Sequence, residues 1–447
     1  MTFTSRFYTL GVSLLLLIAG CKKESTQGEE EEVFVDQGIS NYADADPTND
    51  VMLQAFWWDS YSDALISGYP SLYAFLEEQI IALSNAHIDL LWLPPASEGE
   101  GMGYHPRRLF DLNSLHGSAD DLQGLLEKVQ RRKMHAMADL VFNHRVGTDT
   151  WTDFTEPAWS CESICSDDEG ATNPNAFGTR PCGDPDEGES WGGARDLNHK
   201  SSEVQAGLKT YLQQLKSIGF DAWRYDFVKG FPAKYVATYN QSTPYYFSVG
   251  EYWDGNLNAL KNWIDQTATT ADGQTTPKTA AFDFALKYKL KEALMGKNYS
   301  LLNDSPSLAA IGYGNLSITF IDNHDTGCIN RSDCDNRYAQ NINDITQAYA
   351  YLLTHPGIPM IWGYHYWFTD RSGKLKKEVD ELIKIRKEKG LHANSEVEVL
   401  EAVNGNTGYY AAVIDNRLLV KLGSGDFQPP SGWQVIKSGT GYTLWEK

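Results

Sequence analysis

Basic residues are scarce in this chain of 447 residues. It has 38 lysines and arginines against 59 aspartates and glutamates, so its formal net charge is −21 at pH 7. A surface with this charge repels the phosphate backbone of nucleic acids, and we expect no nucleic acid partner. Neutral ligands meet no such repulsion. The 13 tryptophans and 24 tyrosines supply flat faces on which sugar rings can pack, although most of them are expected in the core.

Cysteines are also few, with six in the whole chain. Cys328 and Cys334 are close enough in sequence to pair across a short loop. Cys161, Cys165 and Cys182 leave three alternatives open: a disulfide between two of them, a zinc site completed by a histidine, or a free thiol.

The apolar stretch at the start of the chain, Phe7 to Ile18, is too short to span a membrane. It ends in Ile18–Cys21, which resembles a bacterial lipoprotein cleavage site with Cys21 as the lipidated residue. The alternative is an ordinary signal peptide followed by an unrelated cysteine. We therefore expect an exported bacterial lipoprotein, at the outer membrane or cell surface or facing the periplasm, that meets the membrane through its lipid anchor alone.

Strand and helix patterns alternate from Val51 onward, which predicts a parallel sheet. Eight strands are expected, at 51–56, 88–93, 137–142, 281–283 and 358–362 and in the runs that end at Asp226, Glu251 and Asp325. Helices are expected at 72–86, 119–132, 202–218, 257–264, up to 294, 345–353 and 374–389.

Two regions interrupt or follow this alternation. The stretch 145–192 is rich in Gly, Pro and Asp and has no clear period, whereas the residues after 391 show short alternating runs typical of an antiparallel sheet. We predict a (β/α)8 barrel with an irregular domain inserted after the third strand and a small C-terminal antiparallel β domain. The expected parts are a signal peptide (1–20), an acidic disordered tether (21–48), the barrel (49–144 and 193–390), the inserted domain (145–192) and the C-terminal domain (391–447).

Three acidic residues stand at the ends of three of these strand runs: Asp226, Glu251 and Asp325. The carboxyl ends of barrel strands face one shared pocket, so these side chains should meet there. Glycoside hydrolysis needs one proton donor and one nucleophile or base, which such carboxylates can supply. Arg224 lies two residues before Asp226 and so on the same strand face, where it would keep Asp226 ionised. A like charge and burial would raise the pKa of Glu251.

Five motifs in order resemble the α-amylase family, glycoside hydrolase family 13, and most closely its plant and archaeal members. They are Asp139–His144, Asp196–His199, Asp221–Gly230, Gly250–Trp253 and Phe320–Asp325. The resemblance extends to Gly103–Pro106, Leu353–Pro359 and Tyr442–Lys447 and covers nearly everything after Val51. In the inserted domain the cysteines and Trp159 depart from the plant pattern.

The resemblance implies a role for each matching residue. Asp226 would be the nucleophile, Glu251 the general acid and base, and Asp325 the third carboxylate. His144 and His324 would donate hydrogen bonds to the sugar at the cleavage position, Tyr104 would stack on it, and Arg224 would contact the same subsite. Lys229 and Trp253 resemble residues of the leaving-group side. A calcium ion would be bound by Asn143, Asp196 and the carbonyl of Gly230, and by Asp186, which fits the spacing best within the loop Asp184–Glu187.

The implied activity is retaining endo-hydrolysis of α-1,4 bonds in starch-like glucans by a monomer. Two alternatives remain open: a family member that forms maltooligosaccharides or transfers glycosyl groups, and a surface glucan-binding lipoprotein that has lost catalysis. The intact set of Asp226, Glu251 and Asp325 argues against the second.

Overall fold

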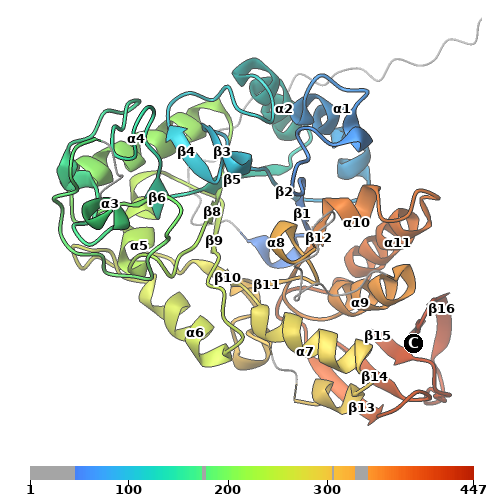
Figure 1. The fold of residues 1–447 in the computed structure, drawn as a ribbon. Helices are drawn as coiled ribbons and strands as arrows, with labels where there is room; N and C mark the ends of the chain where they lie inside the picture. Colours follow the sequence, from blue (N-terminus) through green and yellow to red (C-terminus); the bar gives the residue numbers. More distant parts are fainter. Residues whose placement is uncertain (1–45, 174–177, 305–306, 328–340) are drawn as a thin grey trace, which may run out of the picture. The chain divides into compact units, whose positions relative to one another are not determined.

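Eight parallel strands close into a barrel in the order β1-β12-β11-β10-β9-β8-β5-β2 (Figure 1). This computed structural model describes residues 46–173, 178–304, 307–327 and 341–447, all within one compact unit of residues 39–447. The barrel strands are β1 (Met52–Gln54), β2 (Leu90–Trp92), β5 (His135–Leu140), β8 (Ala222–Tyr225), β9 (Phe247–Gly250), β10 (Ala280–Phe282), β11 (Ser317–Thr319) and β12 (Ile358–Trp362). The predicted barrel is confirmed.

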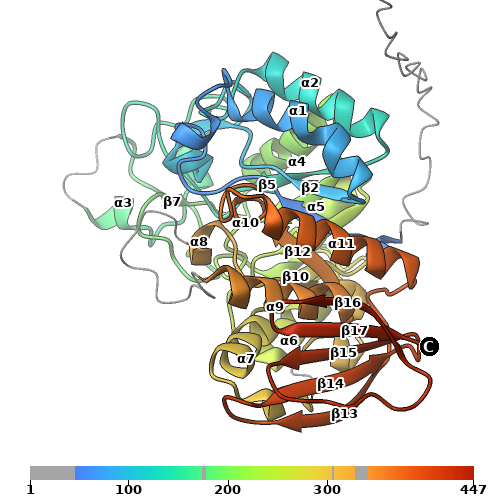
Figure 2. The same ribbon diagram turned by 90° about the vertical axis from the view of Figure 1, so that its right-hand side faces the viewer.

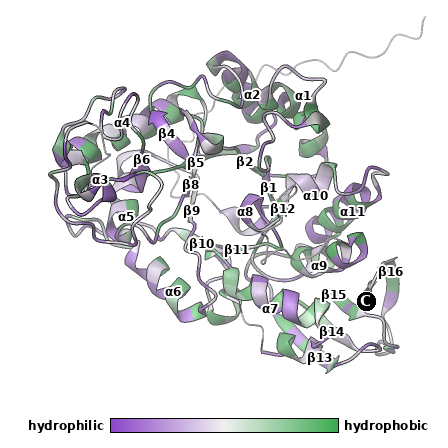
Figure 3. Cartoon of the chain, in the orientation of Figure 1, coloured by the Kyte–Doolittle hydropathy of each residue, from purple (hydrophilic) through white to green (hydrophobic). Residues whose placement is uncertain are grey.

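Helices such as α2 bury one apolar face and leave the other exposed. In α2, Leu122, Leu125, Leu126 and Val129 are buried at helical spacing, and Ser118 with Asp121 forms a capping box at its start. Figure 3 shows hydrophobic and hydrophilic residues mixed along this helix. The longer helices are α1 (Leu72–Asn85), α2 (Ala119–Arg131), α4 (Ser202–Ile218), α5 (Ala233–Ser242), α6 (Leu257–Gln266), α7 (Phe284–Met295), α9 (Ile342–Thr354) and α11 (Lys374–Glu388). The short ones are α3 (Glu169–Thr172), α8 (His324–Gly327) and α10 (Gly363–Trp367).

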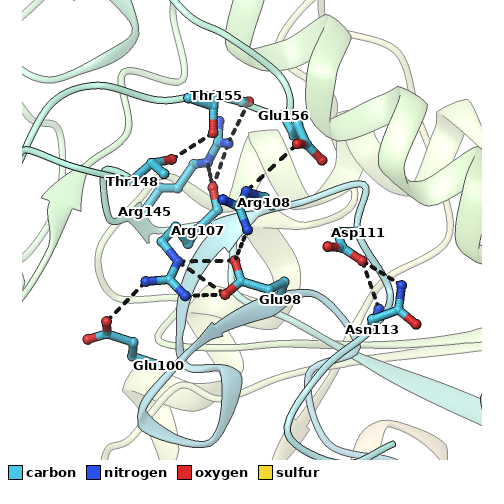
Figure 4. Close-up of polar contacts among 10 residues, drawn as sticks. All are labelled: Glu98, Glu100, Arg107, Arg108, Asp111, Asn113, Arg145, Thr148, Thr155 and Glu156. Carbon is cyan, nitrogen blue, oxygen red and sulfur yellow. Dashed lines mark hydrogen bonds and ion pairs between the residues drawn. The ribbon is translucent and has the colours of Figure 1, made fainter. Parts of the chain in front are cut away.

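The segment inserted after β5 is largely irregular, as its composition predicted. Its described ends meet in a two-stranded sheet of β6 (His144–Arg145) and β7 (Arg195–Asp196). The fully buried guanidinium of Arg145 lies 4.8 Å from the ring centres of both Phe154 and Trp159. It also donates hydrogen bonds to the carbonyls of Arg107, Thr155 and Pro157, so one cation joins the insertion to the barrel side (Figure 4).

A hairpin after β2, formed by β3 (Glu98–Glu100) and β4 (His105–Arg108), lies beside this cation (Figure 4). Arg107 pairs with Glu98 and Glu100, and Arg108 lies 3.8 Å from Glu98. The turn between the two strands carries Tyr104. The ion pairs therefore hold in place the loop that brings this tyrosine to the barrel.

Five antiparallel strands form a second sheet in the order β13-β14-β15-β17-β16 (Figure 2). They are β13 (Val397–Val403), β14 (Tyr409–Ile414), β15 (Leu418–Gly423), β16 (Gln434–Gly439) and β17 (Tyr442–Glu446). Tyr410 of β14 lies with its hydroxyl 3.1 Å from Nε2 of His355, just after α9, and Gln347 of α9 donates to the carbonyl of Gly441. The predicted C-terminal β domain is confirmed, and it packs directly on the barrel helices.

Residues 1–45 lie outside the described part, and with them the expected signal peptide, Cys21 and nearly all of the expected tether. Within the described residues, no helix combines the length and the apolar character needed to cross a bilayer. The exact domain boundaries stay predictions.

Candidate active site

Asp226, Glu251 and Asp325 all lie at the carboxyl ends of barrel strands. Asp226 directly follows β8, Glu251 directly follows β9, and Asp325 belongs to α8, which follows β11. In a parallel barrel these ends share one rim. Asp226 and Glu251 are buried and Asp325 is half-buried. The structure therefore presents all three predicted carboxyl groups at the same end of the barrel.

The buried guanidinium of Arg224 joins carboxylates from neighbouring strands. Its Nη1 donates to Oδ1 of Asp139 at 2.7 Å and to Oδ1 of Asp226 at 2.6 Å. Its Nη2 lies 2.8 Å from Oε1 of Glu251. This is an ion-pair contact without hydrogen-bond geometry, because neither atom has a hydrogen-bond partner among the described residues. One cation thus holds Asp226 and Glu251 close to a common point.

Glu251 is poised to keep its proton. Burial raises the pKa of its carboxyl well above the ordinary value, Arg224 opposes this, and the charges of Asp226 and Asp325 add to the rise. The sequence predicted this direction from burial and the charge of Asp325. The backbone N–H of Phe227 also donates to Oε2 of Glu251 at 3.4 Å. A carboxyl that retains its proton near neutral pH can act as a general acid.

Asp139 is a central residue to which the sequence analysis gave no role. Its Oδ2 accepts hydrogen bonds from the Tyr104 hydroxyl at 2.7 Å and from the indole of Trp92 at 3.0 Å. Burial raises the pKa of Asp139 to about 6, against the lowering effect of Arg224. A charged residue inside the otherwise apolar β5 was the feature that could have identified it.

His324 is fixed in one tautomer by a residue that sequence reasoning missed. Gln54, at the end of β1, places its amide nitrogen 2.8 Å from Nδ1 of His324. That nitrogen can only donate, so Nδ1 accepts and the proton of the neutral ring lies on Nε2. Nε2 is 3.3 Å from Oδ2 of Asp325. Burial lowers the pKa of His324 well below its ordinary value. The ring of Tyr104 stacks on it, with ring centres 5.1 Å apart.

His144 already has a protein partner at each ring nitrogen. Its Nε2 donates to the carbonyl of Tyr104 at 2.8 Å, and its Nδ1 lies 3.2 Å from the amide nitrogen of Asn143. Burial lowers the pKa of His144. A sugar hydroxyl that binds this ring must replace one of these partners. The indole of Trp191 stacks on the ring at 5.5 Å, a contact that nothing in the irregular inserted stretch could have predicted.

Lys229 and Trp253, both predicted on the leaving-group side, make different contacts in the structure. The Lys229 ammonium lies 3.1 Å from Oδ2 of Asp254 and 5.1 Å above the ring of Tyr252. The Trp253 indole donates to the Tyr288 hydroxyl at 2.8 Å, so its polar end is turned toward α7. Lys229 remains near the rim, whereas Trp253 packs against the barrel wall.

The four predicted calcium ligands gather where the insertion meets the barrel. The Asn143 amide donates to Oδ1 of Asp196 at 3.1 Å. A side chain at Gly230 would place its Cβ 1.8 Å from Oδ1 of Asn143, so only glycine allows this approach. Oδ2 of Asp186 is buried without a hydrogen-bond partner in the described part. Burial raises the pKa of Asp196 to about 7, and Asp186 adds to the rise.

This set fits a hard cation, because its donors are oxygens and one of them is an unsatisfied buried carboxylate. Only two of the four ligands are carboxylates; the others are an amide and a backbone carbonyl. This agrees with the finding that no three His, Cys, Asp or Glu side chains of the described residues form a metal cluster.

Cys161 and Cys182 form a disulfide, and Cys165 is a buried free thiol. The bridge uses two of the three thiols that the zinc alternative required, so the disulfide alternative holds. Cys328 and Cys334 lie outside the described residues.

Comparisons with known proteins agree with this fold. Residues 388–446 match the family model described as "Alpha-amylase C-terminal beta-sheet domain". The chain is 31% identical to "Probable alpha-amylase 2" of Arabidopsis thaliana, over 89% of this chain and 94% of that protein. It is 30% identical to "Alpha-amylase 3, chloroplastic" of the same plant, over 89% of this chain and 44% of that protein. The solved α-amylase from Malbranchea cinnamomea superposes with a TM-score of 0.66 at 16% identity, covering 89% of this chain and 96% of that one, which shows a shared fold.

The location predicted from the first 21 residues is contradicted by these comparisons. We expected a bacterial outer-membrane or cell-surface lipoprotein, whereas the two relatives just described, which match 89% of the chain, are plant proteins and one of them is chloroplastic. The prediction depended on a short apolar run and one cysteine, a pattern that carries little information beside a match of this length.

The relationship over most of both chains, the eight-stranded barrel and the C-terminal sheet together confirm the predicted resemblance. The chain belongs to the α-amylase family of glycoside hydrolases.

Proposed function

We propose that this enzyme cuts internal α-1,4-glucosidic bonds of starch- or glycogen-type glucans with retention of the anomeric configuration. The observation that carries the proposal is the pair Asp226 and Glu251, two carboxyl groups from neighbouring strands on one buried guanidinium. Asp226 accepts a charge-assisted hydrogen bond from Arg224, whereas burial favours the protonated form of Glu251. One nucleophile and one acid beside it are what retaining glycosidases require.

In the proposed reaction Glu251 protonates the glycosidic oxygen while Asp226 attacks the anomeric carbon, which forms a glycosyl-enzyme. Glu251, now ionised, takes a proton from water, and this water releases the sugar from Asp226. Asp325 binds sugar hydroxyls and favours the distorted ring. His324, with its proton on Nε2, and His144 donate hydrogen bonds to the same sugar, and Tyr104 packs on it.

The anomer of the first products tests this mechanism. We expect soluble starch to yield α-anomeric reducing ends in proton NMR, with viscosity falling long before much reducing sugar appears. Asp226→Asn should keep the fold by circular dichroism and lose more than about a thousandfold in kcat, because the amide is a poor nucleophile. First-formed β-anomers, or turnover by Asp226→Asn within tenfold of wild type, would refute the assigned roles. Slow viscosity loss would favour the alternative of a maltooligosaccharide-forming enzyme.

We also propose that Asn143, Asp186, Asp196 and the Gly230 carbonyl hold a calcium ion. Bound there, the ion would neutralise the carboxylates of Asp186 and Asp196 and fix the inserted segment next to His144. The unsatisfied oxygen of Asp186 supports this proposal.

Calcium removal should therefore lower the melting temperature. A ligand at 100 times its dissociation constant stabilises the native state by about 2.7 kcal/mol. We expect EDTA to lower the melting temperature by about 3 °C, and added calcium to restore it. Asp186→Asn should reduce the response to EDTA, whereas Asp149→Asn, an exposed residue of the same insertion, should not. Identical melting curves with and without EDTA would rule out this site.

We propose further that the enzyme acts as a monomer with the domain boundaries given above. A single species near 50.0 kDa in light scattering after size exclusion is the expected result for the full chain.

A further inference from the structure

A lysine is completely buried beside the segment that leads to Asp325. Lys287 belongs to α7, and its side chain has no exposed surface. Its ammonium donates to the carbonyl of Ile321 at 2.8 Å and lies 3.3 Å from Oδ1 of Asp322, which is also fully buried. Burial lowers the pKa of Lys287, and the charge of Asp322 opposes this. None of the roles assigned so far uses this ion pair.

Asp322 connects the lysine to α8, the short helix that carries Asp325. Its Oδ1 accepts a hydrogen bond from the hydroxyl of Thr326 at 3.0 Å, and this hydroxyl accepts one from the backbone N–H of Asn323 at 3.1 Å. The side-chain oxygen of Asn323 accepts from the N–H groups of Asp325 and Thr326 at 3.1 and 2.9 Å. The turn of α8 is therefore held by Asn323 within the segment and by the buried ion pair next to it.

A third helix reaches the other oxygen of Asp322. Nε2 of His365, in α10, lies 3.8 Å from this Oδ2. Nδ1 of the same ring is 3.0 Å from the hydroxyl of Tyr349, which already accepts a hydrogen bond from the backbone N–H of Trp362. The hydroxyl proton is then directed at Nδ1, so the proton of the neutral ring lies on Nε2 and faces the carboxylate. Asp322 thus contacts side chains of α7, α8 and α10.

Stability alone does not account for the pair of Lys287 and Asp322. Taking two charges out of water costs free energy that their attraction often fails to recover, and apolar side chains of similar volume would stabilise the core as well or better. What the pair supplies is a fixed direction, because the carboxylate cannot shift without breaking a contact to one of three helices. Such precision matters near a reacting centre, where a displacement of about 1 Å can cost about a hundredfold in rate.

We propose that Lys287 is a positioning residue of the reaction, which fixes α8 through Asp322 and so the place of Asp325. The inference rests on the proposed function, in which Asp325 and His324, both in α8, contact the distorted sugar. These contacts are strongest in the transition state, so loss of the lysine should weaken binding of the transition state more than binding of the glucan. It should lower kcat and leave KM nearly unchanged.

The test uses a variant that removes both charges, because Lys287→Met alone leaves Asp322 buried without its counter-ion and can unfold the chain. Lys287→Met combined with Asp322→Asn keeps an acceptor for the Thr326 hydroxyl. We expect this double variant to melt close to wild type and to lose about ten- to a hundredfold in kcat on soluble starch, per folded enzyme by circular dichroism, with KM within about twofold. The inhibition constant of acarbose, whose flattened ring resembles the transition state, should rise by the factor by which kcat/KM falls.

Thr326→Val tests the connection to α8 and leaves both charges in place. It removes the hydroxyl between Asp322 and Asn323 with little change of volume. We expect kcat to fall about three- to tenfold, the size of one lost hydrogen bond, with KM unchanged. This variant also decides the matter if the double variant does not fold.

Lys289→Met is the matched control, since Lys289 is a half-exposed lysine of the same helix, paired with Glu292 at 3.2 Å. It should keep the kcat and KM of wild type. Wild-type kcat in the folded double variant or in Thr326→Val would overturn the inference. A loss of activity that only follows the loss of folded protein would also overturn it, because Lys287 would then be merely structural. Wild type still cleaves starch in these cases; if it does not, the proposed function itself fails.

Discussion

At the scale of side chains, a single buried arginine joins the proposed catalytic residues. Arg224 contacts Asp139, Asp226 and Glu251, so one positive charge faces three carboxyl groups. Three buried negative charges on one cation would be costly. Protonation of Glu251 relieves this cost, and it is also the state that a proton donor needs.

The same protonation makes the stability of the enzyme depend on pH. Glu251 has a folded-state pKa raised above its ordinary value. Below the ordinary pKa, Glu251 is protonated in both the folded and the unfolded chain, so the native state loses no stability there. As pH rises from there toward the folded pKa, the unfolded state ionises first, and the native state loses stability. We expect Glu251→Gln to melt at a higher temperature than wild type at pH 7 to 8, with the difference vanishing near pH 4.

Calorimetry across this pH range checks the prediction. Glu127→Gln, which removes a carboxylate that is half exposed in a surface ion pair, should show no such pH-dependent gain. A constant difference between Glu251→Gln and wild type at all pH values would contradict a raised pKa.

The sequence predicted the acidic residues near strand ends but not the residues that position their neighbours. Asp226, Glu251 and Asp325 were predictable because each ends an apolar run. Gln54 and Asp139 act through contacts with residues 270 and 85 positions away, namely His324 and Arg224. No local pattern records such a distance in sequence.

At the scale of elements, Arg145 is a central contact of the irregular insertion, which has little regular secondary structure. Its guanidinium lies between two aromatic rings and donates to three backbone carbonyls. Burial lowers the pKa of Arg145 to about 9, and the nearby charge of Glu156 opposes this. This central cation and the Cys161–Cys182 disulfide therefore both stabilise the insertion.

Arg145→Met should be strongly destabilising. The substitution keeps much of the apolar stem but leaves buried carbonyls without donors, at about 1–3 kcal/mol for each such group. We expect a loss of about 2–4 kcal/mol in urea unfolding. Arg131→Met, at a half-exposed surface ion pair, should change stability by less than about 0.5 kcal/mol. Equal effects of the two substitutions would refute the role given to Arg145.

The elements of the barrel were predictable because each strand is a short apolar run and each long helix repeats its buried residues at helical spacing. All eight strands are present and helices such as α4 lie where their patterns predicted, but the run expected to end at Asp325 is a strand only over Ser317–Thr319, and Asp325 belongs to α8. The hairpin β3–β4, helix α5 and the short helices α3, α8 and α10 were missed. The hairpin consists of charged residues held by ion pairs, and α5 carries the mixed sequence of a short helix between two strands. In both cases tertiary contacts decide the structure.

At the scale of the whole molecule, the C-terminal sheet and the barrel share one core. Tyr410 of β14 is buried against His355, and sheet residues such as Val420 and Leu444 belong to the same buried apolar cluster as the barrel residues. The sequence predicted the sheet but not its contact with the barrel, because the residues that form this contact are ordinary apolar and aromatic residues of each part.

We therefore expect one cooperative thermal transition for the enzyme. Tyr410→Ala should keep a single transition but lower the free energy of unfolding by about 3–5 kcal/mol, the cost of removing a buried aromatic ring. Val435→Ala, at an exposed position in the same sheet, should change the free energy of unfolding little. Calorimetry decides the matter, and a separate early transition of the sheet alone would show that the parts are independent.

The pairing of β1 with β12 has a consequence during protein synthesis. Met52 lies opposite Met360, so the barrel cannot close until its last strand has been synthesised. Gln54, which orients His324, stands on that first strand. At about 5–20 residues per second a ribosome needs roughly 15–60 s to make the intervening chain. Throughout that time the nascent polypeptide has an open apolar sheet edge, and no glucan can be cut until translation is nearly finished.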